Sequence, residues 1–568
     1  MEYKLIGTND YDNPLQTFLG NRGVEDINGY INVSEDVVIP YQNLTDIDKA
    51  VDLYRKHIEN NSNITIVVDA DVDGYTSAAM VYSYTKNLNP ECKLTYLIHT
   101  GKQHGLTEDI EIPEDTQLLV IPDAGTNDTE QCKALKEKGI DIIILDHHIQ
   151  DVLNPYAIIV NNQCSDNYEN KELCGAGIVY KFLQAVDEEL WNEDADNYLD
   201  LVALANISDC MDMKSPETKY LVLKGLSFIV NPFFEELIKS QSYYFPDELT
   251  IIGVQFYITP LLNALIRLGS QEEKRVLFRA FIGDESEVFE YKKRGEKEFT
   301  QENIYERAAR LCKNAKGKQK RIVDKQLPAI IEHIKRRNQD SNEVIATNVT
   351  DFIEATMTGV LAIKVAEYFH KPCMLLRERE DGEFGGSVRV PDCSPINNFK
   401  DMLNYTEVFK AQGHEGACGV TVHKDDIKAG IEQLNEYIRA NGLSGIADIL
   451  VDFEIDYEEF DLALFNEIAN LKPYYGQKIN ECKVVIKDIT VNAEDITIKG
   501  ENQNTWSVKI CDEAIELIKF RCPEEDIFLN AEGMYTINIL GKIGYSFFKG
   551  IKTAQIIVEE YEVTWEDD

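Results

Sequence analysis

The sequence predicts an α/β protein with a parallel-sheet domain, a second α/β domain reached through a long helix, and a C-terminal β-barrel-like domain. Three observations support this prediction. From about Ile64 to Asp209, short apolar runs alternate with helical ones, as they do in βαβ units around a parallel sheet. A charged stretch from about Lys297 to Asn338 has the composition of a connector helix. From about Ile449, short β-like runs follow one another, which is typical of a small barrel or sandwich.

The individual elements can be placed from their patterns. The first five strand candidates are "ITIVV", "KLTYLI", "QLLVI", "IDIIIL" and "YAIIV", and the helix candidates after them are "GIVYKFLQAV" and "YLDLVALANI". The C-terminal β runs are "CKVVIKDITV", "EDITIKG", "TWSVKI", "MYTINIL" and "AQIIVEEYEV". We therefore expect a leader over residues 1–45, a catalytic domain over 46–240, a helical region with the connector over 241–342, a second α/β domain over 343–440 and the β domain over 441–568.

Composition excludes several classes of protein. An apolar fraction of 44% in 568 residues describes folded, soluble domains rather than a disordered chain. The apolar runs look too short to span a bilayer, and the first residues lack the features of a signal peptide. Twelve cysteines without a CxxC pair indicate neither a zinc knuckle nor a disulfide framework. We therefore expect a cytoplasmic protein that does not contact a membrane.

The net charge of −42 disfavours long-range attraction to nucleic acid. Between Tyr291 and Arg337, however, the sequence turns locally basic, in "YKKRGEK", "CKNAKGKQKR" and "HIKRR". Two interpretations stay open for this basic strip. It is either the solvated face of long helices or a contact surface for a polyanion.

The segment "DADVDG" places Asp69, Asp71 and Asp73 directly after a predicted buried strand. The same spacing opens an EF-hand calcium loop, which needs a bidentate glutamate at its twelfth position. Counted from Asp69, that position is Met80, and a strand rather than a helix precedes the loop. The calcium-loop interpretation is therefore excluded.

Other predicted strands and helices also end in acids or imidazoles. These residues are Asp123 after "LLVIP", Asp146, His147 and His148 at the end of "IDIIIL", and Asp209 after "LVALANIS". Any one of them could be a cap or a turn residue. Together, at the carboxyl edge of one parallel sheet, they predict a site for Mn²⁺ or Mg²⁺. One or two ions could bind, and two would suit phosphodiester hydrolysis by activated water.

These residues, in this order, resemble the DHH phosphoesterase superfamily, and within it the bacterial and phage RecJ single-strand-specific exonucleases. The leader "NPLQTFLGNRGV" and the motifs "DADVDGYTSAAM", "PDAG", "LDHH" and "LCGAGIVYKF…NISDCMDM" carry the first part of the likeness. The segments "MTGVLAIKVAEYFHKPCMLL", "FGGSVRV" and "GHEGACGV" are similar to the DHHA1 domain, which closes over substrate. The C-terminal β segment stands where RecJ proteins have an OB-fold.

The resemblance implies roles for residues at the catalytic edge. The implied metal ligands are Asp71, Asp73, Asp123, His147 and Asp209. Asp69 would lie at the edge of the site or join as a ligand, and His148 would contact the scissile phosphate or support the ligands. Asp146 would orient the histidines from behind.

The resemblance also implies a phosphate site in the DHHA1-like domain. Ser387, Arg389, Gly413 and His414 match positions that hold the terminal phosphate, a task that suits a guanidinium and glycine amides. The glycines of "GHEGACG" could instead only form a turn. In "TPLLNALIRLG", the residues Asn263 and Arg267 match a nucleic-acid-contacting segment that normally reads P-R-I-N-A-x-G-R.

The chain departs from the family pattern in three respects. Leu261 and Ile266 replace an arginine and a glycine of that segment, which leaves processivity open. The usual G-Y-G-L before the second motif reads "QHGL" here, so His104 is an unassigned candidate near the site. The chain also stops after its OB-like segment, so we expect weaker partner interactions than those of longer relatives.

Four aromatic residues of the OB-like segment have two interpretations. Trp506, Phe528, Tyr545 and Phe548 could stack on unpaired bases, or they could fill the core of the domain.

The resemblance implies a 5′→3′ exonuclease that degrades single-stranded DNA to 5′-mononucleotides in DNA repair or recombination. The implied partners are single-stranded DNA and a single-strand-binding protein or helicase, and the implied state is a monomer. One alternative is a phosphodiesterase for short oligonucleotides or cyclic dinucleotides. The other is a non-catalytic Cdc45-like replication scaffold, which would have broken metal motifs, whereas the four motifs here are intact.

Overall fold

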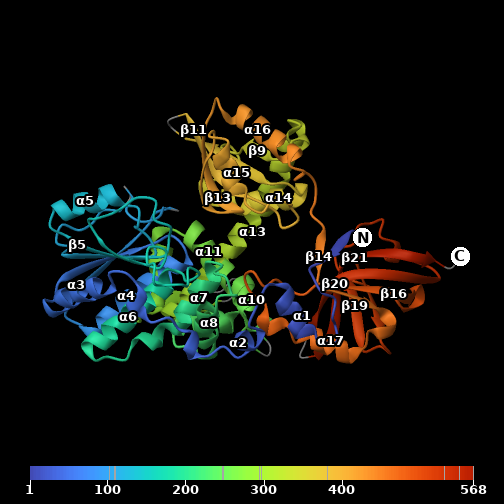
Figure 1. Cartoon of the computed structure of the whole chain (residues 1–568), viewed down its shortest axis with the longest axis horizontal. Helices are drawn as coiled ribbons and strands as arrows, with labels where there is room; N and C mark the ends of the chain where they lie inside the picture. Colours follow the sequence, from blue (N-terminus) through green and yellow to red (C-terminus); the bar gives the residue numbers. More distant parts are fainter. Residues whose placement is uncertain are drawn as a thin grey trace. The chain divides into compact units, whose positions relative to one another are not determined.

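The computed structural model describes residues 1–566 except 102, 108–109, 246–247, 293–294, 296, 380–381, 530 and 549–550. The chain forms two compact units. The first consists of Met1–Asn263, Gln271–Ala309 and Leu450–Asp568, and the second of Ala264–Ser270 and Arg310–Ile449. Figure 1 traces the chain through both units, from the blue N-terminus to the red C-terminus.

A five-stranded sheet with the order β3-β2-β4-β5-β6 lies in the first unit, and all its neighbouring strands are parallel. Its strands are β2 (Asn63–Val68), β3 (Lys93–Ile98), β4 (Leu118–Pro122), β5 (Asp141–Asp146) and β6 (Ile158–Asn161). The five predicted strands are confirmed. Their uninterrupted apolar character is explained by burial, since the central strands β2, β4 and β5 are covered on both faces.

Helices cover both faces of this sheet (Figure 1). On one face lie α3 (Ile47–Glu59), α4 (Val72–Leu88) and α6 (Gly175–Leu190), and on the other lies α5 (Thr129–Glu137). Next along the chain come α7 (Leu199–Ser208), α8 (Pro216–Ser227) and α9 (Pro232–Ser240). Because the strands are parallel, the carboxyl ends of β2, β4 and β5 meet at one edge of the sheet.

A helical stretch follows, made of α10 (Ile251–Gly253), the π-turn η5 (Val254–Ile258) and α11 (Thr259–Leu268), and then α12 (Gln271–Phe281). Among the described residues, Ile251–Leu268 is the one helix long and apolar enough to cross a membrane, with a mean hydropathy of 1.5. The expectation that every apolar run is too short was therefore wrong. More than half of the stretch, 56%, is buried inside the protein, as in a core helix.

The predicted connector helix is present as α13 (Ile304–Arg336), after the short hairpin β7 (Phe289–Tyr291) and β8 (Thr300–Glu302). Along α13, Leu311 and Ala315 are buried, whereas Lys313 and Lys320 are exposed. This pattern matches the solvated-face interpretation of the basic strip. Two of its members, Lys293 and Arg294, lie outside the described residues.

The second unit contains a mixed five-stranded sheet with the order β12-β13-β11-β10-β9. Its strands are β9 (Ile345–Asn348), β10 (Cys373–Glu378), β11 (Glu383–Arg389), β12 (Lys410–His414) and β13 (Ala417–His423). Only β9 and β10 pair in parallel among these described strands. One face packs on α13 and α14 (Thr358–Phe369), the other on α15 (Phe399–Tyr405) and α16 (Ile427–Ala440).

The C-terminal β domain is a seven-stranded sheet with the order β15-β16-β20-β21-β19-β18-β17. Its strands are β15 (Phe453–Asp456), β16 (Val484–Asn492), β17 (Thr497–Lys499), β18 (Thr505–Ile510), β19 (Ile515–Lys519), β20 (Met534–Phe548) and β21 (Ile551–Glu566), and α17 (Leu462–Ala469) precedes β16. Its parallel and antiparallel pairs enclose one apolar core.

The N-terminal residues complete this β domain. Strand β1 (Tyr3–Leu5) pairs with β14 (Ile449–Val451), and α1 (Pro14–Asn21) and α2 (Ile27–Ile31) follow. Phe18 and Tyr30 lie in the same buried cluster as Trp506, and Arg22 forms an ion pair with Asp452. The first thirty residues therefore pack against the C-terminal β domain.

The aromatic residues of the β domain mostly fill its core. Trp506 and Phe528 are 0% and 1% exposed, with ring centroids 5.1 Å apart and an edge-to-face arrangement. Tyr545 is half-buried and its hydroxyl bonds Asn466. The side chain of Phe548 lies outside the described residues. For Trp506 and Phe528, the core interpretation is correct and base stacking is excluded.

Candidate metal centre

The loop between β2 and α4 carries the three alternating aspartates. Asp69 is fully buried, and Asp71 is the N-cap of α4, where its Oδ1 accepts a hydrogen bond from Gly74 N at 3.0 Å. Asp73 lies in the first turn of α4 and is 2% exposed. The strand-to-helix turn therefore presents all three carboxylates at the carboxyl edge of the sheet.

Gly74 allows this turn because of close packing. A Cβ at Gly74 would lie 2.5 Å from Cβ, 2.7 Å from Cα and 2.8 Å from the carbonyl carbon of Asp69. Backbone cannot move away as a flexible side chain can, so any larger residue would push α4 off the loop. The glycine is required by space rather than by a left-handed backbone.

The N-terminus of α6 holds the carboxylate of Asp73. Gly175 N and Ala176 N each donate to it at 2.7 Å, and Ser77 Oγ donates at 3.0 Å. Unpaired amides and the helix dipole make a helix N-terminus a natural partner for a carboxylate. These partners were missed by sequence reasoning, although the glycines of "LCGAG" marked the segment.

Asp123 follows β4 in a left-handed backbone conformation, with φ of +63°, and is 1% exposed. Its amide donates to Leu145 O at 2.8 Å, which fixes the turn against β5. Gly175 packs directly on it, since a Cβ there would lie 2.6 Å from both Cβ and Oδ1 of Asp123. This strained, closely packed position aims the carboxylate into the centre.

Asp146 ends β5 and organises the two histidines after it. Its Oδ1 accepts from His147 N at 2.7 Å, from His148 N at 3.2 Å and from His148 Nδ1 at 2.8 Å. Its Oδ2 accepts from the Thr126 hydroxyl at 2.6 Å. Burial disfavours the charged carboxylate, but the hydrogen bonds from His148 and Thr126 hold the pKa of Asp146 below its usual range.

His147 lies among three carboxylates. Its Nε2 is 3.2 Å from Asp123 Oδ1, 3.5 Å from Asp209 Oδ2 and 3.8 Å from Asp73 Oδ2. Asp209 caps the C-terminus of α7 and comes to the edge from the helical side. One donor atom each from Asp73, His147 and Asp209 lies within 4.8 Å of the others, and so does one each from Asp123, His147 and His148.

These residues fit a divalent cation. Asp123 Oδ1 and Asp209 Oδ2 are buried and make no hydrogen bond to any described residue. Burial and the neighbouring carboxylates raise the pKa of Asp123 and of Asp209, and they raise that of Asp73 to about 6. Buried acids that repel one another need a compensating positive charge. Oxygen-rich ligands with one imidazole suit Mn²⁺ or Mg²⁺.

A second group forms around Asp69. His104 Nδ1 lies 2.5 Å from Asp69 Oδ2, and Gly105 N donates to Asp69 Oδ1 at 3.0 Å. One donor atom each from Asp69, Asp71 and His104 lies within 4.8 Å of the others. The hydrogen bond to Asp69 raises the pKa of His104 to about 9. All the predicted catalytic and metal residues thus meet at one edge of the sheet.

Four predicted phosphate ligands lie on β11 and β12 of the second unit, the two strands that flank β13. Ala417 on β13 pairs with both Arg389 on β11 and His414 on β12. Ser387 is 7% exposed and its hydroxyl is 2.8 Å from that of Thr358. Gly413 has φ of +123°, which favours glycine there. Burial and the positive charge of Arg267 lower the pKa of Arg389.

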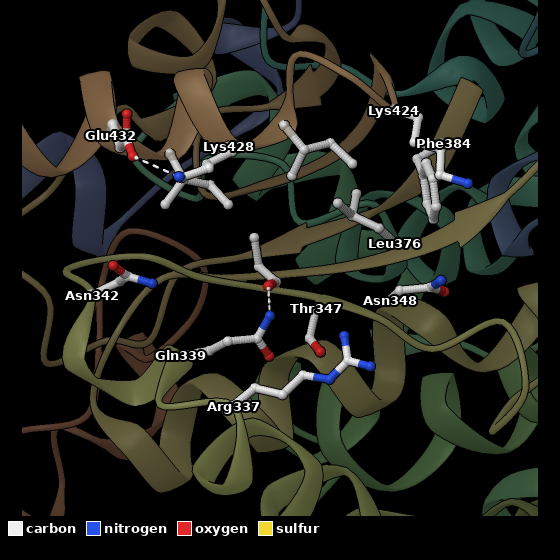
Figure 2. Close-up of a pocket in the computed structure, with 13 residues that line it drawn as sticks. Arg337, Gln339, Asn342, Thr347, Asn348, Leu376, Phe384, Lys424, Lys428 and Glu432 are labelled. Carbon is white, nitrogen blue, oxygen red and sulfur yellow. Dashed lines mark hydrogen bonds and ion pairs between the residues drawn. The ribbon is translucent and has the colours of Figure 1, made fainter. Parts of the chain in front are cut away.

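A pocket of about 450 Å³ is lined by residues of this sheet and of α16 (Figure 2). Its lining includes Phe384 of β11, Lys428 of α16 and Arg337, and it includes none of the four predicted phosphate ligands. Because side chains alternate along a strand, Phe384 and Ser387 point to opposite faces of β11. The predicted phosphate site therefore lies on the α14 face, away from this pocket.

The segment "TPLLNALIRLG" forms α11. Leu261 and Ile266, which replace an arginine and a glycine of the family pattern, are 8% and 1% exposed. Asn263 is half-buried. The two departures thus place apolar side chains in the interior rather than on a surface that could contact a strand.

Two parts of the chain match models of known protein families. Residues 63–206 match the model of the DHH family N-terminal domain, and residues 451–560 match that of the RecJ OB domain. The chain is 38% identical over 571 residues to the putative SPbeta prophage-derived single-strand DNA-specific exonuclease YorK of Bacillus subtilis, covering 99% of this chain and 98% of the relative. It is 24% identical to the single-stranded-DNA-specific exonuclease RecJ of Bacillus subtilis, covering 91% of this chain and 65% of that protein.

Solved structures show the same fold. RecJ from Thermus thermophilus in complex with Mn²⁺ matches with a TM-score of 0.72 at 15% identity, covering 99% of this chain and 78% of that one. The Mg²⁺ complex of that protein matches with a TM-score of 0.66 at 15% identity, covering 99% of this chain and 77% of that one. The predicted fold class, an α/β protein with a parallel-sheet DHH domain and a C-terminal OB domain, is therefore confirmed.

Proposed function

Because the chain belongs to the family of single-strand DNA-specific exonucleases that contains YorK and RecJ, we propose that it is a metal-dependent 5′→3′ exonuclease. Its substrate is single-stranded DNA and its products are 5′-mononucleotides. The observation that carries the proposal is the meeting of Asp73, Asp123 and Asp209 around His147, where two buried carboxylate oxygens accept no hydrogen bond from the described residues. We further propose that the protein is a cytoplasmic monomer. It would act in DNA repair or recombination beside a single-strand-binding protein or helicase.

The metal-binding residues divide into two groups. Asp73, His147 and Asp209 form the first, and Asp69 and Asp71 belong to the second. Asp123 lies close to both groups. Burial raises the pKa of Asp123 most, and the charges of Asp73 and Asp71 are the next largest causes. Mn²⁺ or Mg²⁺ bound here would supply an activated water and neutralise charge on the leaving oxygen.

The neighbouring groups of the chain position these ligands and the phosphodiester. The bond from His148 Nδ1 to Asp146 directs the other ring nitrogen away from the sheet, and half of the side chain, 53%, is exposed. Burial opposes a charge on His148, but Asp146 raises the pKa of His148 to about 10. We assign the other ring nitrogen of His148 to a hydrogen bond with a phosphate oxygen.

The second unit supplies recognition of the strand end. Arg389 and His414 flank Ala417 on adjacent strands, and the positive φ of Gly413 turns the backbone beside them. A guanidinium, an imidazole and glycine amides suit the terminal 5′-phosphate. Arg267 adds positive charge beside Arg389.

Digestion of a 5′-phosphorylated single-stranded oligonucleotide with a 3′ label, in Mn²⁺, tests the proposal. The expected product is a ladder that shortens from the 5′ end with the wild type and with Asp166→Asn, which removes an exposed carboxylate of the same unit. Asp123→Asn should leave the substrate intact. Immediate release of labelled mononucleotide would overturn the polarity. Cleavage of dinucleotides alone would favour a short-oligonucleotide phosphodiesterase, and no hydrolysis at all would favour the scaffold.

A further inference from the structure

His104 reaches the metal centre from a loop to which the proposed mechanism gives no role. The loop follows β3 and contacts both carboxylate oxygens of Asp69, the residue directly after β2. His104 Nδ1 is 2.5 Å from Oδ2, and Gly105 N is 3.0 Å from Oδ1. A second imidazole, of His99, lies 3.8 Å from Asp69 Oδ1 and is 1% exposed. Asp69 thus has three nitrogen atoms within 4 Å of its carboxylate oxygens.

The loop around His104 is held in place by its own contacts. Gly105 adopts a left-handed conformation with φ of +63°, and Leu106 N donates to Asp128 Oδ2 at 2.7 Å. A Cβ at Gly105 would lie 2.2 Å from that same oxygen, so a larger residue would push the Asp128 carboxylate away from Leu106 N. The position of the His104 ring is therefore set by the backbone and not by its bond to Asp69 alone.

Two of the three groups of possible ligands have the same composition. Asp73, Asp209 and His147 form one, and Asp69, Asp71 and His104 form the other, and in each the three donor atoms lie within 4.8 Å of one another. The rings of His104 and His148 are neighbours at this edge, with centroids 6.5 Å apart and planes tilted by 59°. More than half of the His104 side chain, 55%, remains exposed, so a cation could reach it from solvent.

We propose that His104 is a ligand of the cation held by Asp69 and Asp71, so that each of the two cation positions has one imidazole beside its carboxylates. This inference rests on the proposed metal-dependent function and assigns one more residue to the same centre. An imidazole nitrogen favours a transition-metal ion, whereas Mg²⁺ strongly prefers oxygen ligands. His104 should therefore shift the Asp69 position toward Mn²⁺.

Binding of Mn²⁺, measured without substrate, tests this assignment. Free Mn²⁺ would be counted by electron paramagnetic resonance during titration of wild type, His104→Gln, His104→Ala and the control His423→Gln, which replaces an exposed histidine of the second unit. Competition with Mg²⁺ would give the preference between the ions. Electron spin echo modulation, with Mn²⁺ diluted in excess Mg²⁺, would report directly bound ¹⁴N. Melting in chelator would verify that each variant folds.

Both His104 variants should bind one of two Mn²⁺ ions on the order of tenfold more weakly, with a smaller loss for Mg²⁺ and a reduced nitrogen signal. His423→Gln should match the wild type. Unchanged Mn²⁺ affinity and an unchanged nitrogen signal in folded His104 variants would overturn the assignment. Asp123→Asn distinguishes this failure from a failure of the metal-dependent function. If the metal-dependent function is wrong, Asp123→Asn should also bind Mn²⁺ like the wild type. If only the His104 assignment is wrong, Asp123→Asn should still bind Mn²⁺ more weakly.

Discussion

The two five-stranded sheets of this protein differ in the charged groups that they bury. In the parallel sheet, acids from the ends of β2 and β4 meet without enough partners, and oxygens of Asp123 and Asp209 make no hydrogen bond to the described residues. In the mixed sheet, Ser387 bonds Thr358 at 2.8 Å, and Arg389 Nη1 donates to Val388 O at 2.6 Å.

This difference indicates which sheet depends on a ligand for its stability. Buried carboxylates with raised pKa values destabilise the folded protein at neutral pH until a cation compensates them. Polar groups that already have partners impose no such cost. The acids at the edge of the parallel sheet therefore need a cation, whereas Ser387 and Arg389 of the mixed sheet already have partners in the protein.

The largest expected effect is that of Asp123→Asn. Hydrolysis should fall by more than about 10³-fold, because a carboxylate of the metal centre is lost. In chelator the same variant should melt at a higher temperature than the wild type, because the repulsion among the buried acids decreases. Ser387→Ala should instead melt lower, by about 1 kcal/mol of unfolding free energy, since it breaks a satisfied hydrogen bond. A lower melting temperature for Asp123→Asn would remove the contrast between the two sheets.

Gly74→Ala should destabilise the first unit by about 2–4 kcal/mol, because its methyl group would overlap the backbone of Asp69. Gly317→Ala is the matched control. It lies within α13 with its nearest atom at 3.6 Å, and should stabilise by about 0.5–1 kcal/mol through helix propensity. Urea unfolding of both variants measures the difference. Equal stability of Gly74→Ala and the wild type would mean that the turn does not need close contact.

Cation binding should stabilise the parallel sheet selectively. At a Mn²⁺ concentration of 100 times Kd, the wild type should gain about 2.7 kcal/mol of unfolding free energy. Asp123→Asn should gain much less, and Ser387→Ala should gain as much as the wild type. Denaturant titrations with and without Mn²⁺ would show this. An equal gain in all three proteins would place the cation elsewhere.

Arg389→Ala should act on substrate affinity rather than on chemistry. Loss of a charge-assisted contact with the terminal phosphate should raise KM for 5′-phosphorylated DNA by about 10- to 100-fold, with kcat nearly unchanged. The preference for 5′-phosphorylated over 5′-hydroxyl substrate should disappear. Arg439→Ala, an exposed arginine on α16, is the control and should retain both properties. A fall in kcat alone would assign Arg389 to another role.

The sequence was most informative where strand order alone determines position. The ends of β2, β4 and β5 had to share an edge once the strands were parallel, so Asp69, Asp123 and Asp146 could be grouped from the sequence alone. The contact of Asp73 with the amides of α6 could not be predicted, because it depends on how a crossover helix more than a hundred residues later docks.

Long-range packing explains most of what sequence patterns left out. Pairing of β1 with β14 joins residues over 440 positions apart, and no local pattern near Tyr3 records its partner. The aromatic Trp506 fits a stacking surface and a core equally well until its neighbours are known. In the sequence, His104 is distinguished only as a departure from a motif. Its bond to Asp69 depends on how the loop after β3 folds, which no local pattern predicts.

Anomalous X-ray scattering from crystals grown with Mn²⁺ would test the central claim most directly, namely that the carboxyl edge of the parallel sheet is a two-cation centre. The predicted result is two manganese peaks about 3.5–4 Å apart. One should lie among Asp73, His147 and Asp209, and the other beside Asp69 and Asp71. Saturating Mn²⁺ with no peak at this edge, or with peaks only in the second unit, would contradict the claim.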